Sequence, residues 1–102
     1  YLNVIGGLDL DEPAADLASC LALASSFRDR PVPDTMAAVG EVGLTGEIRS
    51  VQGLDQRLAE IARLGFQSCV VPAQIRGEFK APKELELVRV KTLREAIDAI
   101  LA

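Results

Sequence analysis

Residues 13–27 constrain the fold more than any other segment, because they predict a helix that is apolar almost all the way round. Apolar residues recur at three- and four-residue spacing, at Leu17, Leu21, Ala24 and Phe27. Alanines, Cys20 and Leu23 occupy the other faces, and Asp16 is the only charged residue before Arg28. A helix with this pattern is buried inside a domain or covered by a partner. The sequence therefore predicts this helix in the core or in an interface.

The rest of the chain alternates strand and helix patterns. The expected order is a strand at 1–5, the helix at 13–27, strands at 36–42 and 47–51 joined by a turn, a helix at 54–64 ended by Gly65, strands at 68–71 and 85–90 separated by a polar loop, and a helix at 93–101. This order, β-α-β-β-α-β-β-α, predicts a two-layer α/β fold with mixed strand directions.

Composition excludes several classes of protein. The 102 residues are 49% hydrophobic and 25% charged, as in a folded domain, and no apolar run is long enough to span a membrane. A net charge of −4 makes the chain as a whole a poor electrostatic attractant for nucleic acid. The absence of histidine removes every His-based catalytic triad, and two cysteines without histidine cannot make an ordinary zinc site.

Cys20 and Cys69 each lie within an apolar stretch, so we expect buried, reduced thiols in a cytoplasmic protein. The chain starts at Tyr1 inside a strand-like run, without an initiator methionine or a signal-peptide pattern. We therefore expect it to be part of a longer protein.

A Ser–Lys peptidase needs a hydroxyl at an exposed helix start and a lysine made neutral by burial. Ser25 and Ser26 fall in the last turns of the first predicted helix, and the lysines fall in a polar loop and a late strand. This favours packing serines and solvated lysines. A displaced pair, with Ser19 or Ser50 beside a lysine, stays open as an alternative.

The charged residues are distributed unevenly. The acids Asp9, Asp11, Glu12 and Asp16 match no calcium-loop spacing and suit a helix start, so we expect no metal site. No base precedes Arg28, whereas residues 76–83 carry three bases against one acid. Arg76, Lys80 and Lys83 are therefore candidates for contact with nucleic-acid phosphates, with a merely solvated face as the other interpretation.

Two segments resemble a known family. Residues 40–58 read GEVGLTGEIRSVQGLDQRL and resemble, without gaps, the hairpin-to-helix segment of Lon-type proteases. Residues 12–18 read EPAADLA and fall where those proteases carry GPSAG at the first helix. With SSFRDRP at 25–31, this version is similar to the C-terminal Lon-like domain of the RadA (Sms) family of bacterial DNA-repair proteins. The resemblance covers about residues 1–72 with specific motifs.

The resemblance implies a Lon-type fold, related to domain 2 of ribosomal protein S5, in which residues 1–102 form a single domain that lacks the family's N-terminal strands. It places the nucleophilic serine of Lon at Ala14 and the lysine base at Asp55. An alanine and an aspartate cannot form a Ser–Lys dyad, so the resemblance implies a domain without peptidase activity.

By the same resemblance, the domain is a non-catalytic oligomerisation scaffold of a RecA-like, DNA-dependent ATPase, and it aids DNA binding while branched recombination intermediates are processed. The implied partners are further copies of itself, in a ring that is hexameric in the intact parent, and branched or single-stranded DNA; no membrane is implied. Leu17, Leu21, Leu44 and Ile48 are the expected interface residues.

ATP, magnesium and zinc would belong to the parent's ATPase and zinc regions. The chain carries no Walker motif and no Cys-x-x-Cys, so we expect no cofactor here. The Ser–Lys peptidase remains the alternative function, and a nucleic-acid-binding module like ribosomal S5 is the third.

Overall fold

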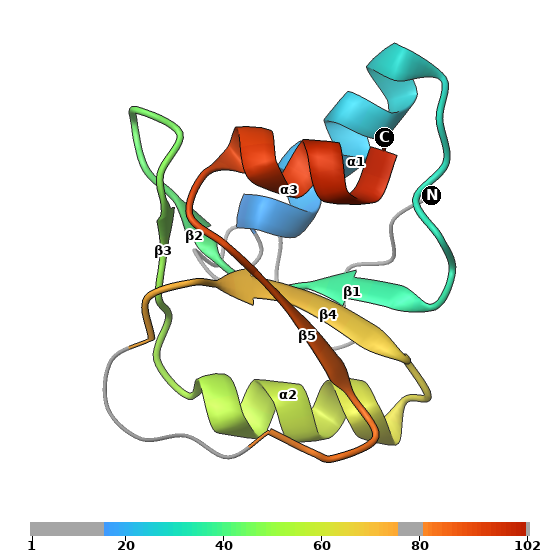
Figure 1. Ribbon diagram of the computed structural model, residues 1–102, viewed down its shortest axis with the longest axis vertical. Coiled ribbons are helices and arrows are strands. Elements are labelled where there is room, and N and C mark those ends of the chain that lie inside the picture. The colour runs from blue at the N-terminus through green and yellow to red at the C-terminus, as the bar shows by residue number, and fades with distance from the viewer. Residues whose placement is uncertain (1–15, 76–80, 102) are drawn as a thin grey trace.

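The computed structural model describes residues 16–75 and 81–101. Along the chain these residues form α1 (Asp16–Arg28), β1 (Met36–Ala38), β2 (Glu41–Val42), β3 (Ile48–Arg49), α2 (Leu54–Arg63), β4 (Ser68–Pro72), β5 (Glu86–Val90) and α3 (Leu93–Leu101) (Figure 1). The α/β class expected from the sequence is confirmed. The strand expected at 1–5 and the first residues of the helix expected at 13–27 lie outside the described residues.

A three-stranded parallel sheet, in the order β1-β4-β5, forms the centre of the fold. Ala38 lies opposite Val70, which in turn lies opposite Val88. The hairpin strands β2 and β3 pair antiparallel as a separate small sheet. Strand directions are thus mixed across the molecule, while the central sheet itself is parallel.

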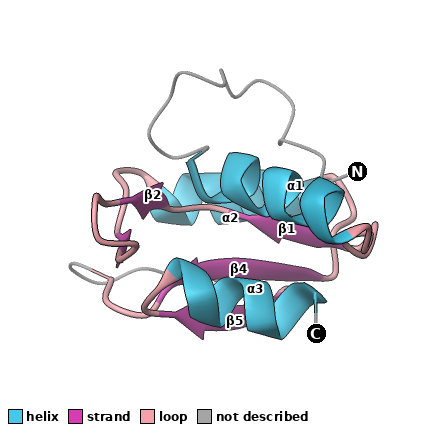
Figure 2. Cartoon of the chain, turned by 90° about the horizontal axis from the view of Figure 1, so that it is seen from above, coloured by secondary structure: helices cyan, strands magenta, loops and turns pink. Residues whose placement is uncertain are grey.

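Helices cover both faces of the central sheet: α1 and α3 lie on one face and α2 on the other (Figures 1 and 2). Successive strand residues alternate between the two cores, as the period of a strand requires. Ala38 and Val70 pack toward α1 and α3, whereas Ala37 and Cys69 pack toward α2. The two-layer prediction is therefore wrong, since apolar residues on both faces of the strands each bury against a helix.

The strand expected at 36–42 is two strands in two sheets, which also corrects the predicted element order. After β1 the N–H of Val39 still donates to the carbonyl of Val70 (2.9 Å), but the carbonyl of Gly40 accepts from the N–H of Leu17 in α1 (3.0 Å). A side chain at Gly40 would lie 2.9 Å from Ile48 Cγ2. The chain leaves the central sheet at Gly40, where only hydrogen fits between α1 and the hairpin.

The helix α1 is buried on one face only. Leu17 and Leu21 are fully buried, whereas Leu23 and Phe27 are 73% and 93% exposed. The sequence predicts this helix in the core or in an interface, and among the described residues the sheet and α3 place one face of it in the core. By contrast, α2 is amphipathic as expected, with Leu58 and Ile61 fully buried.

The two cysteines differ in their environment. Cys69 is buried between the sheet and α2, and burial raises the pKa of its thiol to about 12. Cys20 is only partly buried, which corrects the expectation of two buried thiols; desolvation, with a smaller effect of Asp16, raises its pKa. Both are free thiols, as expected.

Candidate functional site

A groove of about 1180 Å³ lies at the carboxyl ends of β4 and β5, between the β2–β3 hairpin and the start of α2. Ligands of open α/β sheets characteristically bind outside the carboxyl ends of parallel strands. The charged residues that line this groove are Glu41, Glu47, Arg49, Asp55, Arg89 and Lys91. It is the candidate functional site of the described residues.

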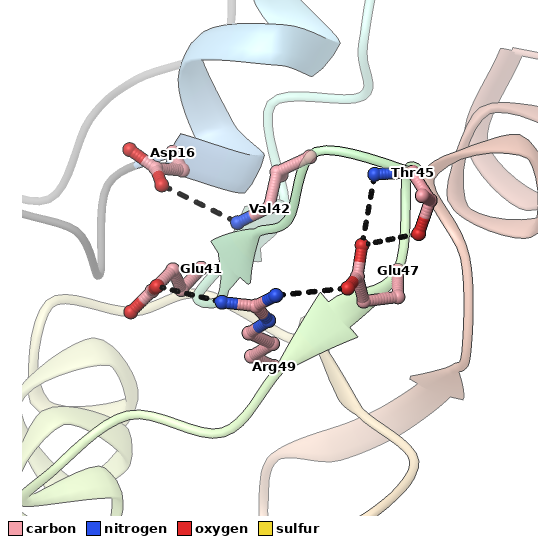
Figure 3. A network of polar contacts seen from close by, with 6 residues as sticks. All are labelled: Asp16, Glu41, Val42, Thr45, Glu47 and Arg49. Carbon is pink, nitrogen blue, oxygen red and sulfur yellow. Dashed lines mark hydrogen bonds and ion pairs between the residues drawn. The ribbon is translucent and has the colours of Figure 1, made fainter.

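One wall of the groove is the hairpin, which a polar network holds in shape (Figure 3). The carboxylate of Glu47 accepts hydrogen bonds from the N–H and the hydroxyl of Thr45 (3.1 and 2.8 Å) and from the guanidinium of Arg49 (2.9 Å). Arg49 also forms an ion pair with Glu41 (3.7 Å). The Thr45 hydroxyl first, then the backbone N–H of Glu47 and Arg49, lower the pKa of Glu47 to about 2.

The turn at the end of this hairpin is short and closely bonded. The N–H of Gly43 donates to the carbonyl of Glu47 (2.8 Å), and the N–H of Gly46 donates to the carbonyl of Gly43 (3.0 Å). Gly46 has a φ of +85°, which glycine adopts without strain. Leu44 stands at the tip of this turn, with its side chain fully exposed.

The hairpin is hydrogen-bonded to α1 and α3, the two helices that share one face of the central sheet. At its start, the N–H of Val42 donates to the carboxylate of Asp16 in α1 (3.3 Å) (Figure 3). At its end, the N–H of Leu93 in α3 donates to the carbonyl of Gly46 (2.8 Å), and the N–H of Ile48 donates to the carbonyl of Lys91 (2.8 Å). The tip therefore projects from a rigid support.

The groove includes Asp55, one of the two positions at which the resemblance to Lon-type proteases would place the catalytic dyad. Asp55 is exposed in the first turn of α2 and lines the groove, where its Oδ1 accepts a hydrogen bond from the N–H of Gln56 (3.0 Å). A carboxylate has no amine nitrogen and cannot serve as the lysine base of a Ser–Lys dyad. Ala14, the other position, lies outside the described residues.

For the alternative Ser–Lys pair, Ser50 and Lys91 both line the groove, but within residues 16–75 and 81–101 no hydrogen bond joins a serine hydroxyl to a lysine. The Ser25 hydroxyl, which is buried, donates to the carbonyl of Arg30. Lys83 is exposed, and Lys91 contributes its backbone N–H to the carboxylate of Glu95 (2.8 Å). Ser25 thus fastens the end of α1, a structural role.

The structure describes only one of the three candidate residues for contact with nucleic acid. Lys83 is exposed on the loop before β5, while Arg76 and Lys80 lie outside the described residues. Sequence reasoning did not single out Arg89 and Lys91, which line the groove. Their two-residue spacing at the end of the strand predicted at 85–90 was the available signal, because the period of a strand directs both side chains to the same side.

Three of the four interface candidates are core residues. Leu17, Leu21 and Ile48 are at most 7% exposed and pack in the cluster beneath α1 and α3, so they offer no surface to a partner in this fold. Leu44 is exposed, as an interface residue must be. The structure exposes two further apolar side chains, Leu23 and Phe27, that sequence reasoning assigned to a covered helix.

Within the described parts of the chain, no group of three or more acidic or cysteine side chains is arranged to hold a metal ion. No helix among the same residues is long and apolar enough to cross a lipid bilayer.

Comparison with known proteins identifies the relatives of this chain. Residues 5–102 match the model of the Lon protease C-terminal proteolytic domain. The chain is 46% identical over 101 residues to the DNA repair protein RadA of Listeria monocytogenes, covering 99% of this chain and 22% of that protein. It is 46% identical over 97 residues to RadA of Bacillus subtilis, covering 95% and 21%, and 44% identical over 102 residues to RadA of Streptococcus pneumoniae, covering 100% and 24%. The chain thus spans less than a quarter of the length of these relatives.

Proposed function

Because this chain belongs to the family of Lon C-terminal proteolytic domains, we propose that it is a non-catalytic Lon-like module of a RadA-type DNA-repair protein. In this proposal the module acts as an oligomerisation scaffold for a RecA-like motor and helps to hold DNA while branched intermediates are processed. The observation that carries the proposal is Asp55, a carboxylate at the start of α2 that lines the groove. By the resemblance, this is the position of the lysine of Lon-type proteases.

The loss of catalysis is tested by restoring the missing groups. The chain with Ala14→Ser and Asp55→Lys is compared with the unchanged chain for cleavage of an unfolded protein substrate. We expect no cleavage by the unchanged chain. Cleavage by the unchanged chain that disappears when Ser19 or Ser50 is replaced by alanine would contradict the proposal and favour the displaced Ser–Lys pair.

The scaffold role is supported by exposed apolar side chains that are available to contact further copies: Leu23 and Phe27, one turn apart on α1, and Leu44 at the hairpin tip. Sedimentation of the longer RadA-type protein with and without this module tests the role. We expect rings only when the module is present. Rings of the same size without it would refute the scaffold role.

The DNA-binding role is supported by two basic side chains of the groove, Arg89 and Lys91, and by the exposed Lys83 on the loop before β5. The third groove base, Arg49, is paired with Glu41 and Glu47. Phosphate contacts make affinity depend on salt, with a slope of about −0.9 per contact on duplex DNA. Replacing Arg89 and Lys91 by alanine in the longer protein should weaken binding and make the slope shallower by about 2.

The matched control for this experiment is Arg94→Ala. Arg94 is an exposed base on α3 that forms a weak ion pair with Asp98 (3.8 Å) and does not line the groove. The Arg94→Ala variant should leave the salt dependence of DNA affinity unchanged. Equal effects of the groove pair and the control would show that the groove makes no specific phosphate contact.

A further inference from the structure

We draw no further inference here: the strongest candidate, the exposed apolar surface patch of Leu23 and Phe27 on α1, carries no proposal because nothing in the part of the chain that the structure describes shows what covers it.

Discussion

Glu47 binds Thr45 and Arg49 through its carboxylate and Gly43 through its carbonyl, so one exposed residue sets the shape of the whole turn. These interactions hold the folded-state pKa of Glu47 at about 2, below the ordinary value of 4.5. A carboxylate with a lowered pKa stabilises the fold fully above its ordinary pKa, and this contribution is lost as pH falls through the folded-state pKa.

Glu47→Gln should therefore lower the urea midpoint at pH 7. The difference in urea midpoint between this variant and the unchanged chain should shrink as the pH falls from about 4.5 to about 2. Glu84→Gln, at an exposed glutamate on the loop before β5, is the matched control and should change little at any of these pH values. A difference for Glu47→Gln that stays constant down to pH 2 would show that its charge does not hold the turn.

Gly43 and Glu47 should be energetically coupled. A methyl group at residue 43 would overlap the carboxylate of Glu47, which is free to swing out to solvent at the expense of its hydrogen bonds. Gly43→Ala and Glu47→Ala should thus destabilise the fold by similar amounts, and the double variant by no more than either alone. Additive losses of unfolding free energy would mean that Gly43 serves another purpose.

Among the helices, the two with a single apolar face were predicted closely from the sequence. The amphipathic pattern and Gly65 located α2 within one residue of its end, and α3 was located at both ends. The strand expected at 36–42 failed, because its alternation continues through Gly40 although the hydrogen-bonding partner changes there from β4 to α1. Only Gly40 marks that change, and a single glycine is a weak signal.

For a related reason, the sequence of α1 could not predict which of its faces is buried. With apolar residues on every face, nothing local says which face packs on the sheet. Leu17 and Leu21 were therefore expected in an interface, and Leu23 and Phe27 were not distinguished from them as the exposed residues. Leu44, which the resemblance implied as an interface residue, is exposed at the tip of its turn. The exposed and buried faces of α1 are decided by the sheet and α3.

A matched pair of substitutions on α1 tests this assignment. Leu21→Ala removes a fully buried side chain and should lower the free energy of unfolding by about 2–5 kcal/mol. Leu23→Ala, two residues along the same helix and 73% exposed, should stay within about 0.5 kcal/mol of the unchanged chain. Urea unfolding measures both, and similar costs at the two positions would mean that α1 is covered on both faces.

At the scale of the whole molecule, the groove joins segments that are distant in sequence: the hairpin, the start of α2 and the ends of β4 and β5. Its position could not be predicted from local patterns, because it depends on the parallel pairing of β4 and β5 and on the side of the sheet that α2 covers. The charges at Arg89 and Lys91 were visible in the sequence, but their meeting with Asp55 and Arg49 follows only from the assembled fold.

The central sheet contributes side chains to both cores, so exposing the core between the sheet and α2 should require global unfolding. Cys69 is buried in that core, and the reactivity of its thiol therefore reports whether the core is exposed. In a Cys20→Ser background, alkylation of Cys69 in native buffer should be at least about a thousandfold slower than in denaturant, the ratio set by an ordinary folding free energy. Urea should speed the reaction with the same dependence as global unfolding. Native-state labelling within about tenfold of the denatured rate, with no response to urea, would instead show that α2 lifts from the sheet independently of the other layer.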